Sequence, residues 1–176
     1  MLTTVVITIF GPDRPGLVES IAARAGAHGG NWLESRLLHL GGHFAGIVRL
    51  EVDENRLGDL LAALRQADDV NLHIVVHDTR ATGTITIPAG TSVTLEIVGH
   101  DRPGIVRAVS RALADRGVNV EELATERSSA PMSGEPIFQA RATITLPAGV
   151  EMTTVRADLE KIAADLMVDV RFGGAR

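Results

Sequence analysis

β-branched and apolar residues follow one another along residues 3–10, which is a pattern typical of a strand. Residues 15–28 carry apolar side chains at helical spacing, namely Leu17, Val18, Ile21, Ala22 and Ala25. Two strand-like runs, 33–40 and 43–52, flank Gly41-Gly42, a pair typical of a hairpin turn. A second amphipathic helix is predicted over 56–67 and a last strand over 70–76. The predicted order is β-α-β-β-α-β.

The second half of the chain repeats this order of elements. Strand-like runs at 92–98, 120–127, 137–146 and 167–172 alternate with helical patterns at 103–116 and 152–166. The β-α-β-β-α-β order is the ferredoxin-like pattern, in which two helices cover one face of a four-stranded antiparallel sheet. The sequence therefore predicts an α+β fold of two such units, at residues 1–78 and 92–176, joined by a linker at 79–91.

A six-residue motif occurs once in each unit. Gly11-Pro12-Asp13-Arg14-Pro15-Gly16 is followed 88 residues later by Gly99-His100-Asp101-Arg102-Pro103-Gly104. The same offset relates Asn31 to Asn119. Self-similarity at a fixed period indicates that one structural unit occurs twice in the chain, so we expect the functional sites to occur as a pair.

Composition favours two small cores held together by aliphatic packing. Apolar residues make up 45% of the 176 residues, aromatic residues only 3%. Small units bury a smaller fraction of their surface than large ones, so we expect a homodimer or a tight intramolecular pair. The absence of cysteine excludes disulfides, thiolate nucleophiles and zinc-thiolate sites, and it fits the reducing cytoplasm.

Charge argues against direct nucleic-acid binding. The net charge is −5, and the 17 lysine and arginine residues are scattered instead of forming a basic face. No segment approaches the run of about 20 apolar residues that a membrane span requires. The first ten residues, MLTTVVITIF, lack the basic region of a signal peptide. We therefore expect a soluble cytoplasmic protein without membrane contact.

Each repeated motif lies between the first strand and the first helix of its unit. A helix start leaves several N–H groups without intrahelical acceptors, and it attracts a carboxylate by about 0.3–1 kcal/mol at an exposed site. Asp13 and Asp101 are expected to cap these helices. Capping satisfies only one or two donors, which leaves room for a ligand. Because an aspartate repels phosphate, a small zwitterion is the better candidate.

Two further features are candidates for binding. Asn31 and Asn119 suit a helix-to-strand turn, and their side chains could equally hold the amino or carboxylate group of an amino acid near the neighbouring loop. The segment 128–136 breaks the symmetry of the repeat. It is either a simple hairpin tip or a loop that covers a ligand or docks a partner through Pro131, Met132, Ser133 and Gly134.

The Gly-x-Asp-Arg-Pro-Gly loop, together with the Gly-x-Asn element after the first helix, resembles the ACT domain, an amino-acid-sensing module of metabolic enzymes and regulators. The two copies, with APMSGEP in the second hairpin, resemble tandem-ACT proteins of the glycine cleavage system transcriptional repressor family. The resemblance implies regulation without catalysis or cofactor, by restraint of a DNA-binding activator. It also implies a small amino acid, glycine or serine among the possibilities, bound at interfaces between ACT units. The residues that match the family's ligand loops are Asp13, Arg14, Pro15, Gly16, Leu17 and Asn31, and Asp101, Arg102, Pro103, Gly104, Ile105 and Asn119.

Other functions find less support in the sequence. His39 and His43 flank the first hairpin turn and His73 and His77 share a strand face, but no Cys or helical His-Glu-x-x-His accompanies them, so no metal is predicted. No Gly-x-Ser-x-Gly elbow or dinucleotide signature is present. The alternative function is an accessory subunit that tunes a metabolic enzyme, because similar loops open the regulatory half of formyltetrahydrofolate deformylases.

Overall fold

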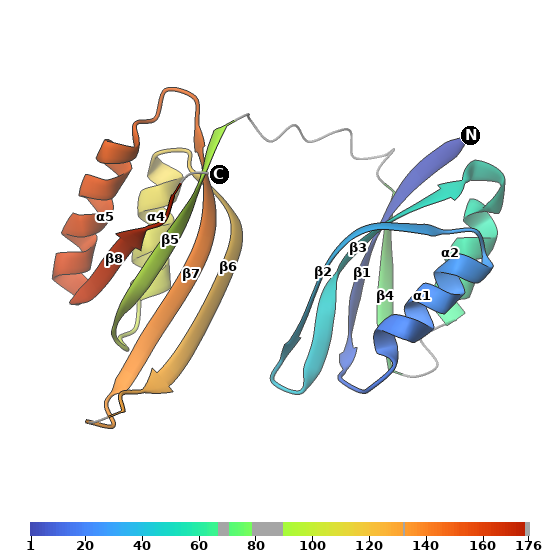
Figure 1. The fold of residues 1–176 in the computed structure, drawn as a ribbon, viewed down its shortest axis with the longest axis horizontal. Coiled ribbons are helices and arrows are strands. Elements are labelled where there is room, and N and C mark those ends of the chain that lie inside the picture. Colours follow the sequence, from blue (N-terminus) through green and yellow to red (C-terminus); the bar gives the residue numbers. More distant parts are fainter. Residues whose placement is uncertain (67–70, 79–89, 132, 175–176) are drawn as a thin grey trace. The chain divides into compact units, whose positions relative to one another are not determined.

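A computed structural model describes residues 1–66, 71–78, 90–131 and 133–174. The chain divides into two compact units, Met1–Ile85 and Thr86–Arg176. Both have the predicted element order and the α+β fold, and Figure 1 shows the two helices of each unit on one face of its sheet.

The first unit contains four strands and two helices, with a short 3-10 turn. The elements are β1 (Leu2–Pro12), α1 (Leu17–Ala27), β2 (Asn31–Leu40), β3 (His43–Asp53), η1 (Glu54–Arg56), α2 (Leu57–Arg65) and β4 (His73–Asp78). The second unit repeats them as β5 (Gly90–His100), α4 (Ile105–Asp115), β6 (Asn119–Ser129), β7 (Pro136–Pro147), α5 (Met152–Leu166) and β8 (Val168–Phe172).

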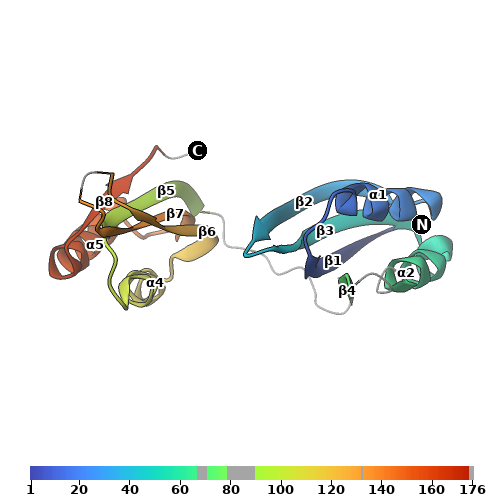
Figure 2. The ribbon, with the colours of Figure 1, turned by 90° about the horizontal axis from the view of Figure 1, so that it is seen from below.

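The two sheets have the same topology. Their strand orders are β2-β3-β1-β4 and β6-β7-β5-β8, and every neighbouring pair is antiparallel. The first strand of each unit is therefore central, and the hairpin that follows the first helix is placed at one edge. Figure 2 shows this arrangement from below, with one face of each sheet covered by helices and the other left open.

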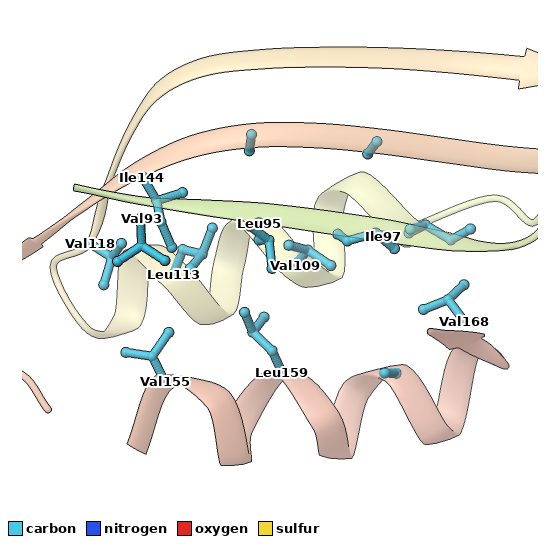
Figure 3. Close-up of a cluster of buried hydrophobic side chains, with 14 of the residues drawn as sticks. Val93, Leu95, Ile97, Val109, Leu113, Val118, Ile144, Val155, Leu159 and Val168 are labelled. Atoms are coloured by element: carbon cyan, nitrogen blue, oxygen red, sulfur yellow. The ribbon is translucent and has the colours of Figure 1, made fainter. Parts of the chain in front are cut away.

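Each unit has its own core between its sheet and its helices. In the second unit, side chains of β5 such as Leu95 meet Val109 of α4 and Leu159 of α5 (Figure 3). In the first unit Ile7 of β1 and Ile21 of α1 are fully buried. Burial of one such side chain contributes about 1.5–3 kcal/mol, so these aliphatic clusters account for stability with few aromatic residues.

The buried stripe on the first helices is narrower than the sequence predicted. Leu17, Ile21 and Ala25 are buried, but Val18 is 45% exposed and Ala22 is exposed as well. In α4 the apolar residue Val106, which corresponds to Val18 in the repeat, is 42% exposed. Residues at i, i+4 and i+8 point at the sheet, whereas their neighbours turn toward the open side of the helix.

Several predicted boundaries were wrong by a few residues. The strand predicted over 70–76 begins at His73, because Asn71 has a positive φ of 59° and forms a turn. The strand predicted from 167 begins at Val168, because Met167 is in the left-handed region with a φ of 55°. Gly90 and Thr91, assigned to the linker, belong to β5. The rest of the predicted linker, 79–89, and residues 67 and 70 lie outside the described residues.

Candidate functional site

The repeated motif forms an exposed elbow between the first strand and the first helix of each unit. In the first elbow, residues 12–16, the chain leaves β1 and enters α1 at Leu17. The residue before the helix is Gly16, with a φ of 87°, and its counterpart Gly104 has a φ of 99°. Only glycine adopts this backbone conformation at little cost, which explains why the motif ends in glycine twice.

The first turn of each helix carries amide donors without acceptors. The first intrahelical bonds run from Ser20 N–H to the Gly16 carbonyl and from Ala108 N–H to the Gly104 carbonyl, both 2.9 Å long. The three N–H groups before each of these bonds donate to no acceptor in the described part of the chain. Two of the three donors in each helix belong to exposed residues, Val18 and Glu19 in α1 and Val106 and Arg107 in α4, and these are candidates for contact with a small anion.

The side chains of two predicted ligand residues do not face the elbow. The side chains of Leu17 and Ile105 are 4% and 2% exposed and pack in the cores. Their side chains are therefore not available to a ligand at the elbow. Arg14, Pro15, Arg102 and Pro103 are exposed, as expected for an open elbow.

The prediction that the aspartates cap the helices was wrong. Neither helix has a side-chain cap at its first turn. Instead, a carboxylate oxygen of Asp13 lies 2.5 Å from Nδ1 of His39, and one of Asp101 accepts a hydrogen bond of 2.7 Å from Nε of Arg127. Each aspartate precedes its helix by four residues, so its side chain turns toward the neighbouring hairpin.

The backbone strengthens the same connection. The N–H of Asp13 donates to the Gly42 carbonyl at 3.0 Å, and the N–H of Asp101 donates to the Pro136 carbonyl at 2.9 Å. Each elbow is thus fastened to its hairpin by one main-chain bond and one side-chain pair. The sequence pattern indicated His39 only as a candidate metal ligand and indicated no role for Arg127. The offset of 88 residues relates these two positions and would have identified the pair.

The two elbows differ in charge. The third residue of the helix is Glu19 in the first unit and Arg107 in the second. In the second elbow, Arg102, Arg107 and Arg127 outweigh Asp101, whereas in the first elbow Asp13 and Glu19 outweigh Arg14. The second elbow is therefore the better place for a carboxylate.

The asparagines, which recur at the offset of the repeat, do not lie at the elbow of their own unit. Asn31 is paired with Glu51, which is paired with Thr4 of β1, so it lies eight residues along the sheet from Pro12. At about 3.3 Å per residue, the separation is about 26 Å. Asn119 lies in the same way opposite Ser92, and its amide donates to Glu121 at 2.6 Å. The first helix returns the chain to the far end of the sheet, so the expectation of a neighbouring loop was wrong within one unit.

The asymmetric loop 128–136 lies at the same end of the sheet as the second elbow. Its turn is closed by bonds from Ala130 N–H to the Glu135 carbonyl and from Gly134 N–H to the Ala130 carbonyl, of 2.8 and 2.9 Å. Glu135 approaches His100 of the elbow at 3.8 Å. Pro131 and Ser133 are exposed, and Met132 lies outside the described residues.

The histidines considered as metal ligands have other partners. The ring of His43 stacks on Phe10 with 5.2 Å between centroids, and Nε2 of His77 lies 3.1 Å from the hydroxyl of Thr8. Within the ranges that the structure describes, no group of three or more histidine or acidic side chains is arranged to hold a metal ion. None of the described helices combines the length and apolar content needed to cross a membrane.

Comparison with known proteins agrees with this fold. A model of the ACT domain matches residues 3–77, and a second ACT-domain model matches residues 93–149. The glycine cleavage system transcriptional repressor of Escherichia coli (strain K12) is 25% identical over 162 residues, which cover 92% of this chain and 84% of the relative.

Two solved structures share the fold over nearly the whole chain. A protein of unknown function from Galdieria sulphuraria has a TM-score of 0.85 at 27% identity and covers 98% of both chains. A structure named as a proposed glycine cleavage system transcriptional repressor has a TM-score of 0.71 at 16% identity and covers 98% of this chain and 97% of its own. The second of these likenesses concerns the fold alone.

Proposed function

The chain belongs to the ACT-domain family, with two ACT units in tandem, and on this basis we propose that it is a non-enzymatic, amino-acid-responsive regulator. It controls transcription of glycine cleavage or related amino-acid metabolism genes through contact with a DNA-binding activator. The distant relative over 92% of the chain, which is named as a transcriptional repressor, supports the regulatory role. The net charge of −5 supports action through a protein and not through DNA. We place this regulator in the cytoplasm.

The observation that carries the proposal is the pair of exposed helix starts with accessible amide donors, each beside an aspartate. The donors suit the carboxylate of a small amino acid such as glycine or serine, and the aspartate suits its ammonium group. The extra positive charge of Arg107 and Arg127 makes the second elbow the stronger site. A few such hydrogen bonds give a micromolar to millimolar dissociation constant, equivalent to about 4–8 kcal/mol.

Regulation follows if the two states of the protein differ in affinity for the amino acid. A ligand shifts such an equilibrium only by its difference in affinity between the states. A bound amino acid would thus favour one packing of the ACT units, and the activator would bind that packing better or worse than the other.

A thermal-shift screen with the twenty amino acids tests the proposal first, because a ligand that binds only the native state raises the apparent stability. Calorimetry then compares the wild type with Asp13→Ala/Asp101→Ala, which removes the acceptor for the ammonium group and frees the elbow from the hairpin. Weaker binding is expected. The matched control is Asp59→Ala/Asp165→Ala, which removes two exposed carboxylates from other helices. Unchanged affinity in the elbow variant would refute this site.

The asparagines are tested separately by Asn31→Ala/Asn119→Ala. Because each lies about eight residues along the sheet from its own elbow, we expect a smaller loss of affinity than in the aspartate variant. An equal loss of affinity would contradict the proposal that the elbow binds the amino acid without the asparagine of its own unit. A pulldown distinguishes the two regulatory roles: capture of a transcription activator supports the proposal, and capture of a metabolic enzyme supports the accessory subunit.

A further inference from the structure

The open face of the first unit's sheet carries a cluster of exposed apolar side chains. We call this surface the apolar face; its members are Phe10, Leu38, Leu40, Ile47 and Val75, which are between 50% and 73% exposed. They come from all four strands and adjoin in register: Thr8 is paired with both Ile47 and Val75, and Ala45 is paired with both Phe10 and Leu38. The cluster therefore extends across the sheet, opposite the helices.

The second unit shows that the fold does not require apolar residues on this face. The row formed by Thr8, Ile47 and Val75 corresponds in register to Glu96, Arg141 and Arg171 of the second sheet. Leu38 of β2 corresponds to Glu126 of β6. Leu38 is paired with Ala45 of β3, and Glu126 is paired with Gln139 of β7. In the second unit an Arg141–Glu96 ion pair of 2.8 Å lies on this face. An exposed apolar patch where a homologous sheet is charged indicates a contact surface.

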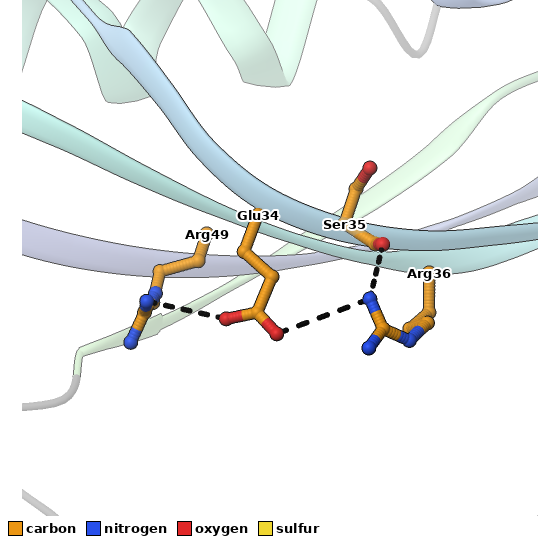
Figure 4. Close-up of polar contacts among 4 residues, drawn as sticks. All are labelled: Glu34, Ser35, Arg36 and Arg49. Carbon is orange, nitrogen blue, oxygen red and sulfur yellow. Dashed lines mark hydrogen bonds and ion pairs between the residues drawn. The ribbon is translucent and has the colours of Figure 1, made fainter.

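Charges of both signs lie beside the apolar face. Glu34 lies between Arg49 and Arg36, with N···O distances of 3.2 and 3.9 Å (Figure 4). Glu34 and Arg49 are paired in register, and Arg36 is paired with Ile47, so all three share the open face. A second copy of this surface would bring no block of like charge against the first, and like charges are what usually oppose self-association.

The extent of the apolar face fits a homodimer. Five large side chains that are each at least half exposed present on the order of 500 Å² of apolar surface. A standard interface buries about 800 Å² per partner, and in homodimers about 65% of it is apolar, which is also about 500 Å². A partner of an open sheet face must match its shape as well as its chemistry. Another copy of the apolar face supplies that shape and chemistry; the charged face of the second unit does not.

We propose that two copies of this chain dimerise through the apolar faces of their first units, sheet against sheet, as a two-fold symmetric pair. The sheets pack about 10 Å apart, as aligned sheets do elsewhere. Ile47 and Phe10 lie in the core of this interface, and Glu34, Arg36 and Arg49 lie at its rim. A self-complementary surface of this kind closes the assembly at two subunits. This inference does not depend on amino-acid binding.

The first test is the mass of the full chain in solution. Light scattering after gel filtration should give two chains for the wild type. Ile47→Arg/Val75→Arg introduces the residues that the second sheet carries at the same positions, so the fold tolerates them, and like charges then oppose each other across the interface. We expect the dimer dissociation constant to rise by about 100-fold or more. The matched control, Val98→Arg on the open face of the second unit, should remain a dimer.

Crosslinking provides an independent test, because the chain has no cysteine. Under oxidation Ile47→Cys should form a covalent dimer and Val98→Cys should not. A monomeric wild type would overturn the proposal, as would a dimer that survives Ile47→Arg/Val75→Arg and leaves Ile47→Cys uncrosslinked. A monomer whose capture of a different protein is abolished by Ile47→Arg/Val75→Arg would assign the apolar face to that protein instead.

Discussion

Replacing Gly16 with alanine should destabilise the first unit, whereas replacing Gly26 in the same helix should stabilise it. A Cβ added at either position meets no atom within 4 Å, so neither change creates a clash. The two differ in backbone: Gly16 has a φ of 87°, and Gly26 lies within α1 with no positive φ. The comparison of Gly16→Ala with Gly26→Ala therefore measures the free-energy cost of the left-handed backbone at residue 16.

The magnitude follows from this backbone difference. A left-handed conformation costs an alanine about 1–2 kcal/mol. Alanine also reduces the conformational entropy of the unfolded chain, which stabilises the folded state by about 0.4–1 kcal/mol. The net effect of Gly16→Ala should therefore be to lower the free energy of unfolding by about 1 kcal/mol. Gly26→Ala gains from the same restriction and from helix propensity, and near the helix end we expect a gain of about 0.5 kcal/mol. A loss of 1 kcal/mol lowers the melting temperature of a domain of this size by about 4–8 °C.

Trp32 makes the measurement specific to one unit. It is the only tryptophan of the chain, it lies in β2, and it packs against the first core. Urea unfolding followed by its fluorescence reports the first unit, and Gly104→Ala serves as a control that acts in the second. A stability gain in Gly16→Ala, or equal effects of Gly16→Ala and Gly26→Ala, would refute the assignment of the left-handed elbow.

Three further predictions follow from the core, the elbow pair and the asymmetric loop. Leu159→Ala removes a fully buried side chain of α5 and should cost about 2–5 kcal/mol in the second unit, measured by thermal unfolding; a loss below 1 kcal/mol would contradict the packing. His39→Arg gives the first elbow the pairing of the second and should change stability by less than about 0.5 kcal/mol; a larger loss would mean that the elbows are not equivalent. Deleting residues 129–135 should weaken amino-acid or partner binding if this loop covers a ligand or docks a protein, and unchanged affinities in calorimetry and pulldown would rule out both roles.

The element order and the tandem fold were predictable because hydrophobic periodicity and the repeated motif indicated the same two units. Element ends were less predictable where a single residue adopts a left-handed backbone. Asn71 and Met167 do so, and neither is the glycine that usually signals this conformation. The exposure of Val18 could not be predicted from its apolar character, because only the sheet beneath the helix decides which residues face the core.

The candidate site was predicted in part. The motif identified the elbow and its amide donors, because a glycine before an amphipathic helix has direct conformational consequences. The partners of Asp13 and Asp101 were missed because they lie 26 residues further on, in a hairpin whose register is set by the sheet. The distance between the asparagines and their elbows was also not predicted. Each asparagine follows its elbow closely in the sequence, but the helix between them carries the chain to the opposite end of the sheet.

The double attachment of each elbow to its hairpin has a mechanical consequence. Asp13 is held by its amide and its carboxylate to two positions on opposite sides of the same turn, Gly42 and His39. Any movement of the elbow therefore also displaces the end of the hairpin, at the edge of the sheet. A ligand that displaced the elbow would thereby also displace the hairpin end, and a second macromolecule in contact with the hairpin would respond without touching the ligand.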